Sequence, residues 1–580
     1  MGRVTFADPE AEIAYLLGQD PANPKMMGGA YEASDRHSRE LATWNPPVRS
    51  ADGDILPSKR IGDARAADML RNDSLVNAGQ GLHKDNIVGS MFFLNAKPNT
   101  VVLGLDDVWA TEFQEEVEAK FTLWAESLNN WPDASRRNTF TDLIRLAVGI
   151  YLAGGEVLAT VEWMRSNNRP YQTAIQMIEN SRLCDPGDQA YDFDRVRGGI
   201  KFDSYGAPQG YYIRRALQGG QNEWLQQHKW SYVRARNSIG RPQVIHLVEQ
   251  SRPGQSRGIS QLVAAMKEMK MTKDFRDVTL QNAVVNASFA ATIESDLPTG
   301  EIFAALGGGD PAGGVVDYAA QYLTAVQQFS DSSKNMSMDG AKIPHLLPGS
   351  KLNLTPMGTP GGIGSEFESS LLRYVAANLG VSYEQFSKDY SKTNYSSARA
   401  GMVETWKYMM SRKRVVADKF ASTLYRLWFE EALNMGEITS MPRNAPNFYE
   451  GLNMEAYTSA EWIGAGRGQI DELKETQAAI LKVKMGLSTY EAELAKQGQD
   501  WRVVAAQRKR EKELHEGMGL VTEESNAINA ASGTVNEPGD DKTTDQKPGD
   551  KASEVSIQVV DLMNATPPSD VVEDDENVEV

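Results

Sequence analysis

The sequence predicts an α+β fold with long helices, a mixed but mostly antiparallel β region, and a disordered acidic tail. Three observations support this prediction. Apolar residues recur at three- and four-residue steps in windows such as 107–129, as they do on one face of a helix. Residues 156–248 instead contain period-two alternation, which is typical of strands. From residue 521 the chain is rich in Glu, Asp, Asn, Thr, Pro and Gly, a composition typical of disorder.

Length and composition indicate a soluble globular protein with two to four domains or subdomains. The chain has 580 residues, of which 41% are hydrophobic and 24% charged. No apolar run is long enough for a membrane-spanning helix, and no secretory signal is expected at the N-terminus. Cys184 is the only cysteine, which excludes an internal disulfide and fits a reducing cytoplasm. We interpret Cys184 as a small hydrophobic residue rather than a nucleophile.

Negative charge is concentrated at the C-terminal end. The formal net charge is −18, and residues 521–580 carry −12 of it through fifteen acidic and three basic residues. Proteins that bind DNA through counterion release are strongly basic. We therefore expect any contact of this chain with DNA to be weak, transient or repulsive.

The N-terminal half is predicted to begin with an arm and three helices. Residues 20–60 are rich in Pro, Gly and Ala, and we expect them to wrap a surface or a neighbouring chain. Residues 60–89 show the spacing of an amphipathic helix and lead into a strand-like run at 91–94. Two further helices are predicted at 107–129 and 136–153.

The β region is predicted from four segments with alternating apolar residues. These are a strand at 156–164, a hairpin at 198–214, and strands at 229–235 and 242–248. A helical window then runs from Gly258 to about Ala291, with Ser260 as its expected N-cap. Its apolar positions are sparse and its middle is charged. This pattern favours a helix that packs against other chains or lines a solvent space.

The C-terminal half is predicted to be mainly helical. The expected elements are loops in 292–350, a short strand at 346–358, a helix at 367–380 that ends at Gly380, a long helix at 396–434, two or three helices in 468–516, and a short apolar docking segment at 555–563 within the tail.

The search for chemistry finds no active site. No Gly-x-x-x-x-Gly-Lys-Ser/Thr loop occurs, so the stretch 251–260 is better explained as the turn that starts the next helix than as a phosphate loop. The six histidines form no metal-ligand pair, and neither His-Glu-x-x-His nor Gly-x-Ser-x-Gly is present. We therefore predict a protein that is not an enzyme, with no catalytic residues, no metal and no cofactor.

Four blocks of sequence together resemble lambda-type bacteriophage portal proteins. They are RNDSLVNAGQGLHKDNIVG (71–89), RPGQSRGIS (252–260) after VIHLVEQ, LGVSYEQFSKDYSKTNYSSARAGMVE (379–404) and WIGAGRGQIDELKETQAAILKVKMGLST (462–489). The blocks keep the family's order and extend over about 60–520. The family pattern is less clear at 293–345, and the acidic tail has no counterpart.

The resemblance implies a ring, normally of twelve subunits, at one vertex of a capsid. Duplex DNA would pass through its centre without sequence specificity during packaging and ejection. The implied partners are the terminase, head-completion or adaptor proteins, and the major capsid and scaffold proteins, with no membrane contact. The implied location is the portal vertex of the virion, after assembly in the host cytoplasm.

The same resemblance implies a portal-type fold with wing, stem, clip and crown regions. The expected ranges are an N-terminal arm (1–59), a mixed α/β wing (60–250 and 346–450), a stem helix (251–292), a clip and return stem (293–345), crown-like helices (451–520) and the disordered acidic tail (521–580).

Three groups of residues become functional candidates. A tunnel loop near 380–395, beside the 396–434 helix, would bring four residues to the DNA channel: Lys388, Tyr390, Lys392 and Asn394. An exposed connector held by Tyr383 and Phe386 is an equally good interpretation of that loop. Candidates at the start of the stem helix or between subunits are Arg252, Arg257, Gly258 and Ser260, of which the two arginines would bridge subunits or face DNA, with bridging favoured. Candidates for lining the stem are Lys267, Lys270, Lys273 and Arg276.

The charge balance suggests how such a channel would work. Duplex DNA presents one charge per ~1.7 Å of its axis, so a channel that bound every phosphate would stall it. A mostly acidic lumen with a few lysines would let DNA slide while keeping it centred. Two alternatives stay open: another structural head or tail adaptor protein, and a packaging-associated nuclease.

Overall fold

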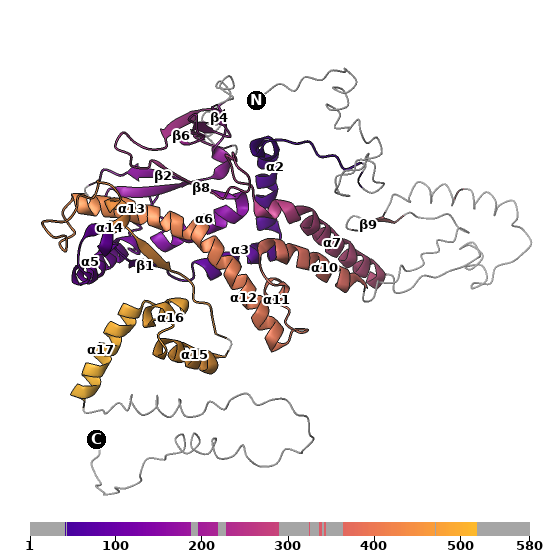
Figure 1. Cartoon of the computed structure of the whole chain (residues 1–580). Coiled ribbons are helices and arrows are strands. Elements are labelled where there is room, and N and C mark those ends of the chain that lie inside the picture. Colours follow the sequence, from indigo (N-terminus) through magenta and orange to yellow (C-terminus); the bar gives the residue numbers. More distant parts are fainter. Residues whose placement is uncertain are drawn as a thin grey trace, which may run out of the picture. The chain divides into compact units, whose positions relative to one another are not determined.

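The computed structural model of the chain describes residues 41, 43–166, 168–186, 195–217, 228–288, 324, 336–338, 341–343, 363–469 and 471–518 (Figure 1). The predicted strand at 346–358, the acidic tail and its docking segment at 555–563 lie outside these residues, as do most of the arm and most of 293–345. The chain divides into two compact units, Met1–Ala505 and Ala506–Val580. Among the described residues, no helix is both long and apolar enough to cross a membrane.

Two helices occupy the first predicted helical window. α2 spans Ala51–Asn72 and α3 spans Ser74–Ile87, so the single helix expected over 60–89 is wrong. Asp73 separates them because its backbone is extended, with φ −121° and ψ 117°. Its carboxylate also accepts hydrogen bonds from the backbone N–H groups of Leu75 and Val76, which caps the second helix.

The two helices predicted at 107–129 and 136–153 are confirmed as α5 (Asp107–Ala125) and α6 (Phe140–Gly154). The short helix α4 (Thr100–Leu103), which precedes them, was not predicted. The predicted apolar face of α5 is buried, from Trp109 through Phe113 to Trp124. Thr139 and Asp142 form a capping box at the start of α6, which satisfies backbone N–H groups that would otherwise lack a partner.

Two antiparallel sheets form the β region. The three-stranded sheet has the order β3-β2-β8, built from β2 (Glu156–Trp163), β3 (Thr173–Ile178) and β8 (Val244–Val248). The four-stranded sheet has the order β4-β5-β6-β7, built from β4 (Val196–Arg197), β5 (Ile200–Phe202), β6 (Pro208–Arg214) and β7 (Trp230–Arg234). The predicted hairpin and strands are confirmed. β3 was not predicted, and neither was the short 3₁₀ turn η2 (Asn180–Arg182) that follows it.

A third pairing joins distant parts of the sequence. β1 (Phe93–Ala96) confirms the strand-like run near 91–94 and pairs antiparallel with β11 (Ala460–Ile463). β11 follows the short helix α14 (Asn453–Tyr457). The sequence pattern predicted neither α14 nor β11.

The charged helical window after β8 starts later than predicted. Ser260 accepts a hydrogen bond from the backbone N–H of Leu262 and caps a 3₁₀ turn, η4 (Gln261–Ala265), before α7 (Met266–Ser288) begins. α7 lies beside α10 (Ile363–Leu379) in Figure 1. The two helices run antiparallel, since η4 contacts the C-terminal end of α10 at Asn378 while Phe275 of α7 contacts Phe367 near its start. A two-stranded hairpin, β9 (Met336–Met338) and β10 (Ala341–Ile343), lies between them in sequence.

The predicted long helix at 396–434 is confirmed as one continuous helical stretch with an irregular middle. α12 (Tyr395–Arg412) passes through a π-helical turn, η5 (Lys413–Asp418), into α13 (Lys419–Asn434). A π-helical turn inserts extra backbone and is often found at functional positions. Here Lys413 contacts both Asp418 at 2.7 Å and the carbonyl of Trp462 at 2.8 Å, which ties the turn to β11.

The main hydrophobic core lies among α5, α6 and α13. Phe121 of α5 is 1% exposed, and its ring lies 5.1 Å from that of Phe140 and 5.2 Å from that of Trp428. Burying such aromatic side chains stabilises a fold by roughly 1.5–3 kcal/mol each. A smaller cluster, which includes Leu158 and Tyr211, fills the space between the two larger sheets.

The C-terminal helices of the described chain are α15 (Glu472–Lys484), α16 (Tyr490–Lys496) and α17 (Trp501–Gly517), which confirms the two or three helices predicted there. None of the three contains a buried residue. Their exposed apolar side chains include Leu473, Leu481, Tyr490 and Val503. Such helices lack the packed face that normally stabilises a helix within one chain.

A buried histidine gives the fold a pH dependence. His83 of α3 is 3% exposed and donates a hydrogen bond from Nε2 to the carbonyl of Leu379 at 2.9 Å. Burial lowers the pKa of His83 from 6.5 to about 4. Between these pH values the unfolded chain binds the proton and the folded chain does not, so the free energy of unfolding decreases as the pH falls.

Replacing His83 with glutamine is expected to remove most of this acid sensitivity. The amide nitrogen of His83→Gln can still donate to Leu379 but cannot take up a proton. Wild-type protein should lose up to about 3 kcal/mol of unfolding free energy between pH 7 and pH 4 through His83 alone, whereas the variant should not. Urea denaturation at both pH values measures the difference, and equal losses in the two proteins would contradict the assignment.

Candidate functional site

The stretch 251–260 forms the junction between β8 and η4. Its first four residues are exposed, and residues 255–258 are buried. The hydroxyl of Ser260 donates to the carbonyl of Leu152 at 2.8 Å, which holds the start of η4 against the end of α6. The junction is therefore a turn that starts a helix, as the sequence indicated.

Two glycines allow the backbone to pass closely at this junction. Gly155, which ends α6, has a left-handed φ of +73°, and a Cβ there would lie well inside van der Waals contact with the backbone of Ile259. A Cβ on Gly258 would in turn overlap the carbonyl of Gly155. Both positions therefore require glycine, and Gly258 serves close packing within the chain.

A buried ion cluster lies beside the two glycines. Glu156, at the first position of β2, is fully buried. Its carboxylate accepts hydrogen bonds from Nε of Arg257 at 3.0 Å and from the backbone N–H of Gly258 at 2.9 Å. Lys59 of α2 lies 3.1 Å from the same carboxylate, and His246 of β8 lies 3.2 Å from it. The cluster therefore connects α2, β2, β8 and the junction.

Two cations and the hydrogen bonds around it keep Glu156 ionised. Burial alone would raise the pKa of this carboxyl, but Arg257, His246 and Lys59 together hold the pKa well below its usual range. Asp63 of α2 lies 2.9 Å from Lys59, yet burial raises its pKa. Two cations and two acidic groups thus meet in the interior, where the loss of one partner would leave another unpaired.

The two candidate arginines of the junction differ in position. Arg252 is half exposed and pairs with Asp54 at 2.7 Å at the start of α2. Arg257 is 3% exposed, and its remaining N–H groups donate to the carbonyls of Leu183, Gly198 and Asn180. The expectation that Arg257 bridges subunits or faces DNA is therefore corrected, because its guanidinium is satisfied inside one chain.

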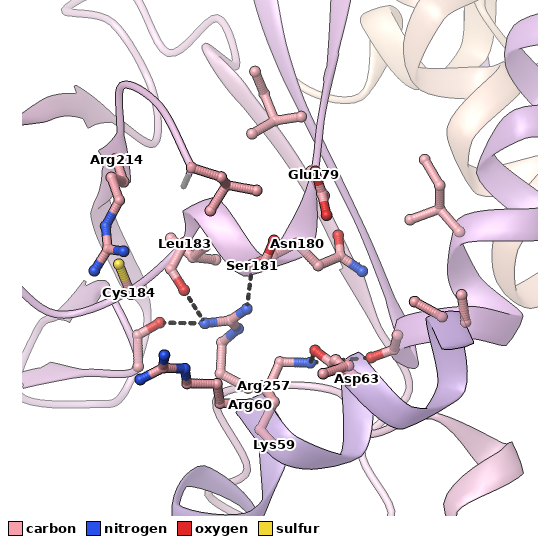
Figure 2. Close-up of a pocket in the computed structure, with 18 of the residues that line it drawn as sticks. Lys59, Arg60, Asp63, Glu179, Asn180, Ser181, Leu183, Cys184, Arg214 and Arg257 are labelled. Atoms are coloured by element: carbon pink, nitrogen blue, oxygen red, sulfur yellow. Dashed lines mark hydrogen bonds and ion pairs between the residues drawn. The ribbon is translucent and has the colours of Figure 1, made fainter. Parts of the chain in front are cut away.

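A cavity of about 740 Å³ opens beside the cluster (Figure 2). Figure 2 shows Arg257 hydrogen-bonded along one wall, with Lys59 and Asp63 of α2 on another and Cys184 near Arg214 on the far side. The apolar part of the wall includes Leu56, Ala64, Leu146, Ile150, Ile178 and Leu217. The size falls in the range of ligand and peptide pockets.

The predicted tunnel loop lies between two helices. α11 (Tyr383–Ser387) ends at Lys388, which has a left-handed φ of +60°, and α12 begins after Asn394. Lys388, Tyr390 and Lys392 are exposed. Asn394 caps α12 by accepting a hydrogen bond from the backbone N–H of Ser397 at 2.8 Å, so part of its role is structural. Phe386 is buried and Tyr383 half-buried, which fits the connector interpretation equally well.

The candidate stem residues lie on α7. Lys270 forms an ion pair with Asp274, and Arg276 forms one with Glu368 of α10. Lys273 donates to the carbonyl of Asn72 at 3.2 Å, and Lys267 is exposed. Much of this positive charge is therefore engaged within the chain, and Arg276 holds the α7–α10 pair together.

The contacts around Glu156 give this carboxylate a structural role within the chain. Among the residues that the structure describes, no group of three or more His, Cys, Asp or Glu side chains is placed to hold a metal ion. The Glu156 carboxylate is surrounded by donors of its own chain, so it serves to join segments.

Sequence reasoning missed most of this cluster. Glu156 was included only as the first residue of a predicted strand, and Lys59 was not singled out. The available signal was a glutamate opening an otherwise apolar strand, because a buried carboxylate requires a cationic partner. The identity of that partner depends on contacts across 101 and 97 residues of sequence, which no local pattern contains.

Comparisons with known proteins match most of the chain. A family model described as "Phage portal protein, lambda family" matches residues 37–413. The portal protein of Escherichia phage N15 is 37% identical over 517 residues, which covers 88% of this chain and 94% of that protein. Portal protein B of Escherichia phage lambda is 36% identical over the same length, with the same coverage. A probable portal protein of Halomonas phage phiHAP-1 is 20% identical over 497 residues.

Similar solved structures come from gene transfer agent particles. A chain from the neck of the native particle, computed with C12 symmetry, matches 76% of this chain and 98% of its own length, with 12% identity and a TM-score of 0.33. A chain from the neck of the empty particle, computed with C6 symmetry, gives 13% identity and a TM-score of 0.35 over 78% and 95% of the two chains.

Proposed function

The chain belongs to the lambda family of phage portal proteins, and from this premise we propose that twelve copies form a ring at one capsid vertex. The ring would be the channel for DNA packaging and ejection and the docking site for the terminase and head–tail connector proteins. The observation that carries the proposal is the identity of 36–37% to two portal proteins across 88% of the chain.

Several helices that are exposed in a single chain support the proposal that copies of the chain assemble. α15, α16 and α17 contain no buried residue, and the first half of α12 is exposed at Tyr395, Ser396 and Arg399. Helices without a packed apolar face gain stability when a neighbouring chain covers them. Contacts between copies in a ring would supply that cover.

The regions of a portal map onto the described elements as follows. We assign the wing to 60–250 and to the parts of 346–450 outside α10, and the stem to 251–292 with α7. The return helix of the stem, expected within 293–345, is better assigned to α10 at 363–379, because α10 packs antiparallel against α7. The clip would remain within 293–345, and the crown-like helices would be 451–520.

The channel would be lined by parts of these regions that stay exposed in one chain. Lys388, Tyr390 and Lys392 in the tunnel loop, and Lys267 on α7, meet this condition. Arg252 keeps the candidate role at a subunit boundary because it is half exposed. A mostly acidic lumen with these few cations would let DNA slide without stalling.

The remaining partners and the location follow from the same proposal. Head-completion or adaptor proteins, the major capsid protein and the scaffold protein would contact the outside of the ring. The protein would assemble in the host cytoplasm and reside at the portal vertex of the virion. It would perform no reaction, and DNA translocation would be driven by the separate terminase.

Native mass spectrometry and electron microscopy of the purified protein test the proposal. We expect a closed ring of twelve copies with a bore wide enough for duplex DNA and a lumen that is not predominantly basic. A monomer, or a six-membered ring, would favour another head or tail adaptor. ATP hydrolysis or DNA cleavage that a point mutation abolishes would instead favour a packaging nuclease.

A further inference from the structure

The outer face of the four-stranded sheet combines aromatic rings with positive charge. In the pairing of β6 with β7, Tyr212 lies opposite Tyr232 and Gly210 lies opposite Arg234. Residues that are paired across strands, or two apart along one strand, point to the same side of a sheet. Tyr211, which alternates with them, is buried in the small core between the two sheets. The side that carries Arg234 therefore points away from the interior.

The positive charge on this face lacks a counter-charge in the described part of the chain. Residues 187–241 contain nine basic and five acidic residues, although the whole chain has a net charge of −18. Arg234 is exposed, and Tyr232 is 45% exposed. Lys201 of β5 lies on the same face, because it pairs with Gly210. Neither Arg234 nor Lys201 forms an ion pair with another described residue.

Gly210 lets the ring of Tyr232 lie flat over the sheet. A Cβ at residue 210 would lie 2.4 Å from the hydroxyl oxygen of Tyr232. The ring of Tyr212 lies 5.0 Å from that of Tyr232, measured between centroids. The two rings form a shallow apolar surface with Arg234 beside it. Tyrosine and arginine are enriched where proteins contact one another.

The outer face of α5 carries the opposite charge. Residues 98–130 contain seven acidic residues and one basic residue. Glu112 and Glu115 are exposed on the side of α5 that faces away from its buried stripe, and neither forms an ion pair with another described residue. The same side carries two exposed apolar residues, Val108 (70% exposed) and Leu123 (78%). Helical spacing places these four side chains on one face.

These two faces belong to the outermost layers of one folded unit. α5 packs on α6 and α13 in the main core, and these two helices pack on the three-stranded sheet (Figure 1). Val157 and Ala159 of β2 face the main core, whereas Leu158 faces the small core under the four-stranded sheet. The layers therefore follow the order α5, α6 with α13, three-stranded sheet, four-stranded sheet. The acidic face of α5 and the basic face of the four-stranded sheet lie at opposite ends of this stack.

A closed ring requires two different surfaces of this kind on each chain. The contact in a ring repeats head to tail, so one surface of each copy binds a different surface of the next copy. When the ring has many members, the two surfaces lie on roughly opposite sides of the subunit. The acidic face of α5 and the basic face of the sheet meet this condition in position, and they are complementary in charge.

Resting on the ring proposed above, we propose that the outer face of α5 in one copy docks on the outer face of the four-stranded sheet in the next copy. The exposed glutamates of α5 face Arg234 and Lys201. The exposed apolar residues of α5 pack on the rings of Tyr212 and Tyr232. The contact gives a basic sheet its counter-charge within an assembly of acidic chains, without nucleic acid.

Cysteine crosslinking of the full-length protein tests this contact. In a Cys184→Ser background, a chain with both Glu112→Cys and Arg234→Cys should react with a short bis-maleimide to give a ladder of covalent oligomers that ends at the size of the ring. Coexpressed single variants, one with each cysteine, should give only covalent dimers, because each copy then carries one of the two thiols. Denaturing electrophoresis and mass mapping of the linked peptides identify the products.

A third cysteine position provides the control. The side chain of Asp68 on α2 is 61% exposed but belongs to neither face, so Asp68→Cys should crosslink to residue 234 several-fold more slowly than Glu112→Cys does. If the wild-type protein forms no ring in native mass spectrometry, the proposed function itself fails. If the ring is intact but residues 112 and 234 crosslink no faster than 68 and 234, or if 234 links to 234, this interface is refuted while the ring stands.

An exchange of charges separates a direct contact from a general effect of charge. Glu112→Arg with Glu115→Arg, and Arg234→Glu with Lys201→Glu, should each lower the fraction of assembled ring several-fold, and combining all four changes should restore most of it. A combined variant that assembles no better than either parent would contradict the pairing. Fluorescence anisotropy with a duplex oligonucleotide tests the other occupant. Binding by intact rings that Arg234→Glu abolishes without loss of assembly would assign the basic face to nucleic acid and overturn the proposal.

Discussion

Replacing Glu156 with glutamine is expected to destabilise the protein by about 3–5 kcal/mol, because the variant leaves buried cations without their counter-charge. The carboxylate is fully buried and is contacted by Arg257, Lys59 and the backbone N–H of Gly258. A glutamine side chain offers one acceptor oxygen where the carboxylate offers two, and its NH₂ group would face donors. Urea denaturation followed by tryptophan fluorescence measures the loss.

An exposed pair in the same junction provides the control. Arg252 and Asp54 lie 2.7 Å apart, but both side chains are nearly half exposed. Asp54→Asn should therefore change the unfolding free energy by less than about 1 kcal/mol. The comparison requires similar denaturant slopes in both variants. A Glu156→Gln protein as stable as Asp54→Asn would show that the cluster does not join these segments as described.

Replacing Gly258 with alanine is the second change with a large expected effect. The added methyl group would overlap the carbonyl of Gly155, which belongs to the backbone at the end of α6 and cannot move aside like a side chain. Overpacking of this kind typically costs about 1–3 kcal/mol and occasionally more. Because the junction, α6 and β2 would all have to shift, we expect the free energy of unfolding to fall by about 3 kcal/mol or more. Soluble yield and the urea midpoint measure it.

The variant Gly254→Ala is the control that distinguishes backbone strain from steric overlap. Its φ is +78°, yet a Cβ there would meet no atom within 4 Å. Gly254→Ala should therefore cost only the ~1–2 kcal/mol of a left-handed backbone conformation. If Gly258→Ala were no more destabilising than Gly254→Ala, close packing of the two backbone segments at the junction would be refuted.

The regular elements show why some predictions succeeded. The aromatic stripe of α5 is a local pattern that reports a buried face directly, and the apolar run of β2 indicated a strand in the same local way. The helix predicted over 60–89 is divided at Asp73, because the side chain of Asp73 caps α3 instead of continuing α2. β3 and β11 were missed, since each depends on a partner strand rather than on strong alternation of its own.

The sequence by itself determined the family, the α+β class, the helix-starting turn at 251–260 and the negative charge of the chain, because motifs, periodicity and composition are local properties. Only the tertiary structure decided that Arg257 faces Glu156 inside one chain, that α10 packs against α7, and that a cavity opens beside α2. These features join residues far apart in sequence. Burial determines which charges must be paired, and the fold alone determines which residues are buried together.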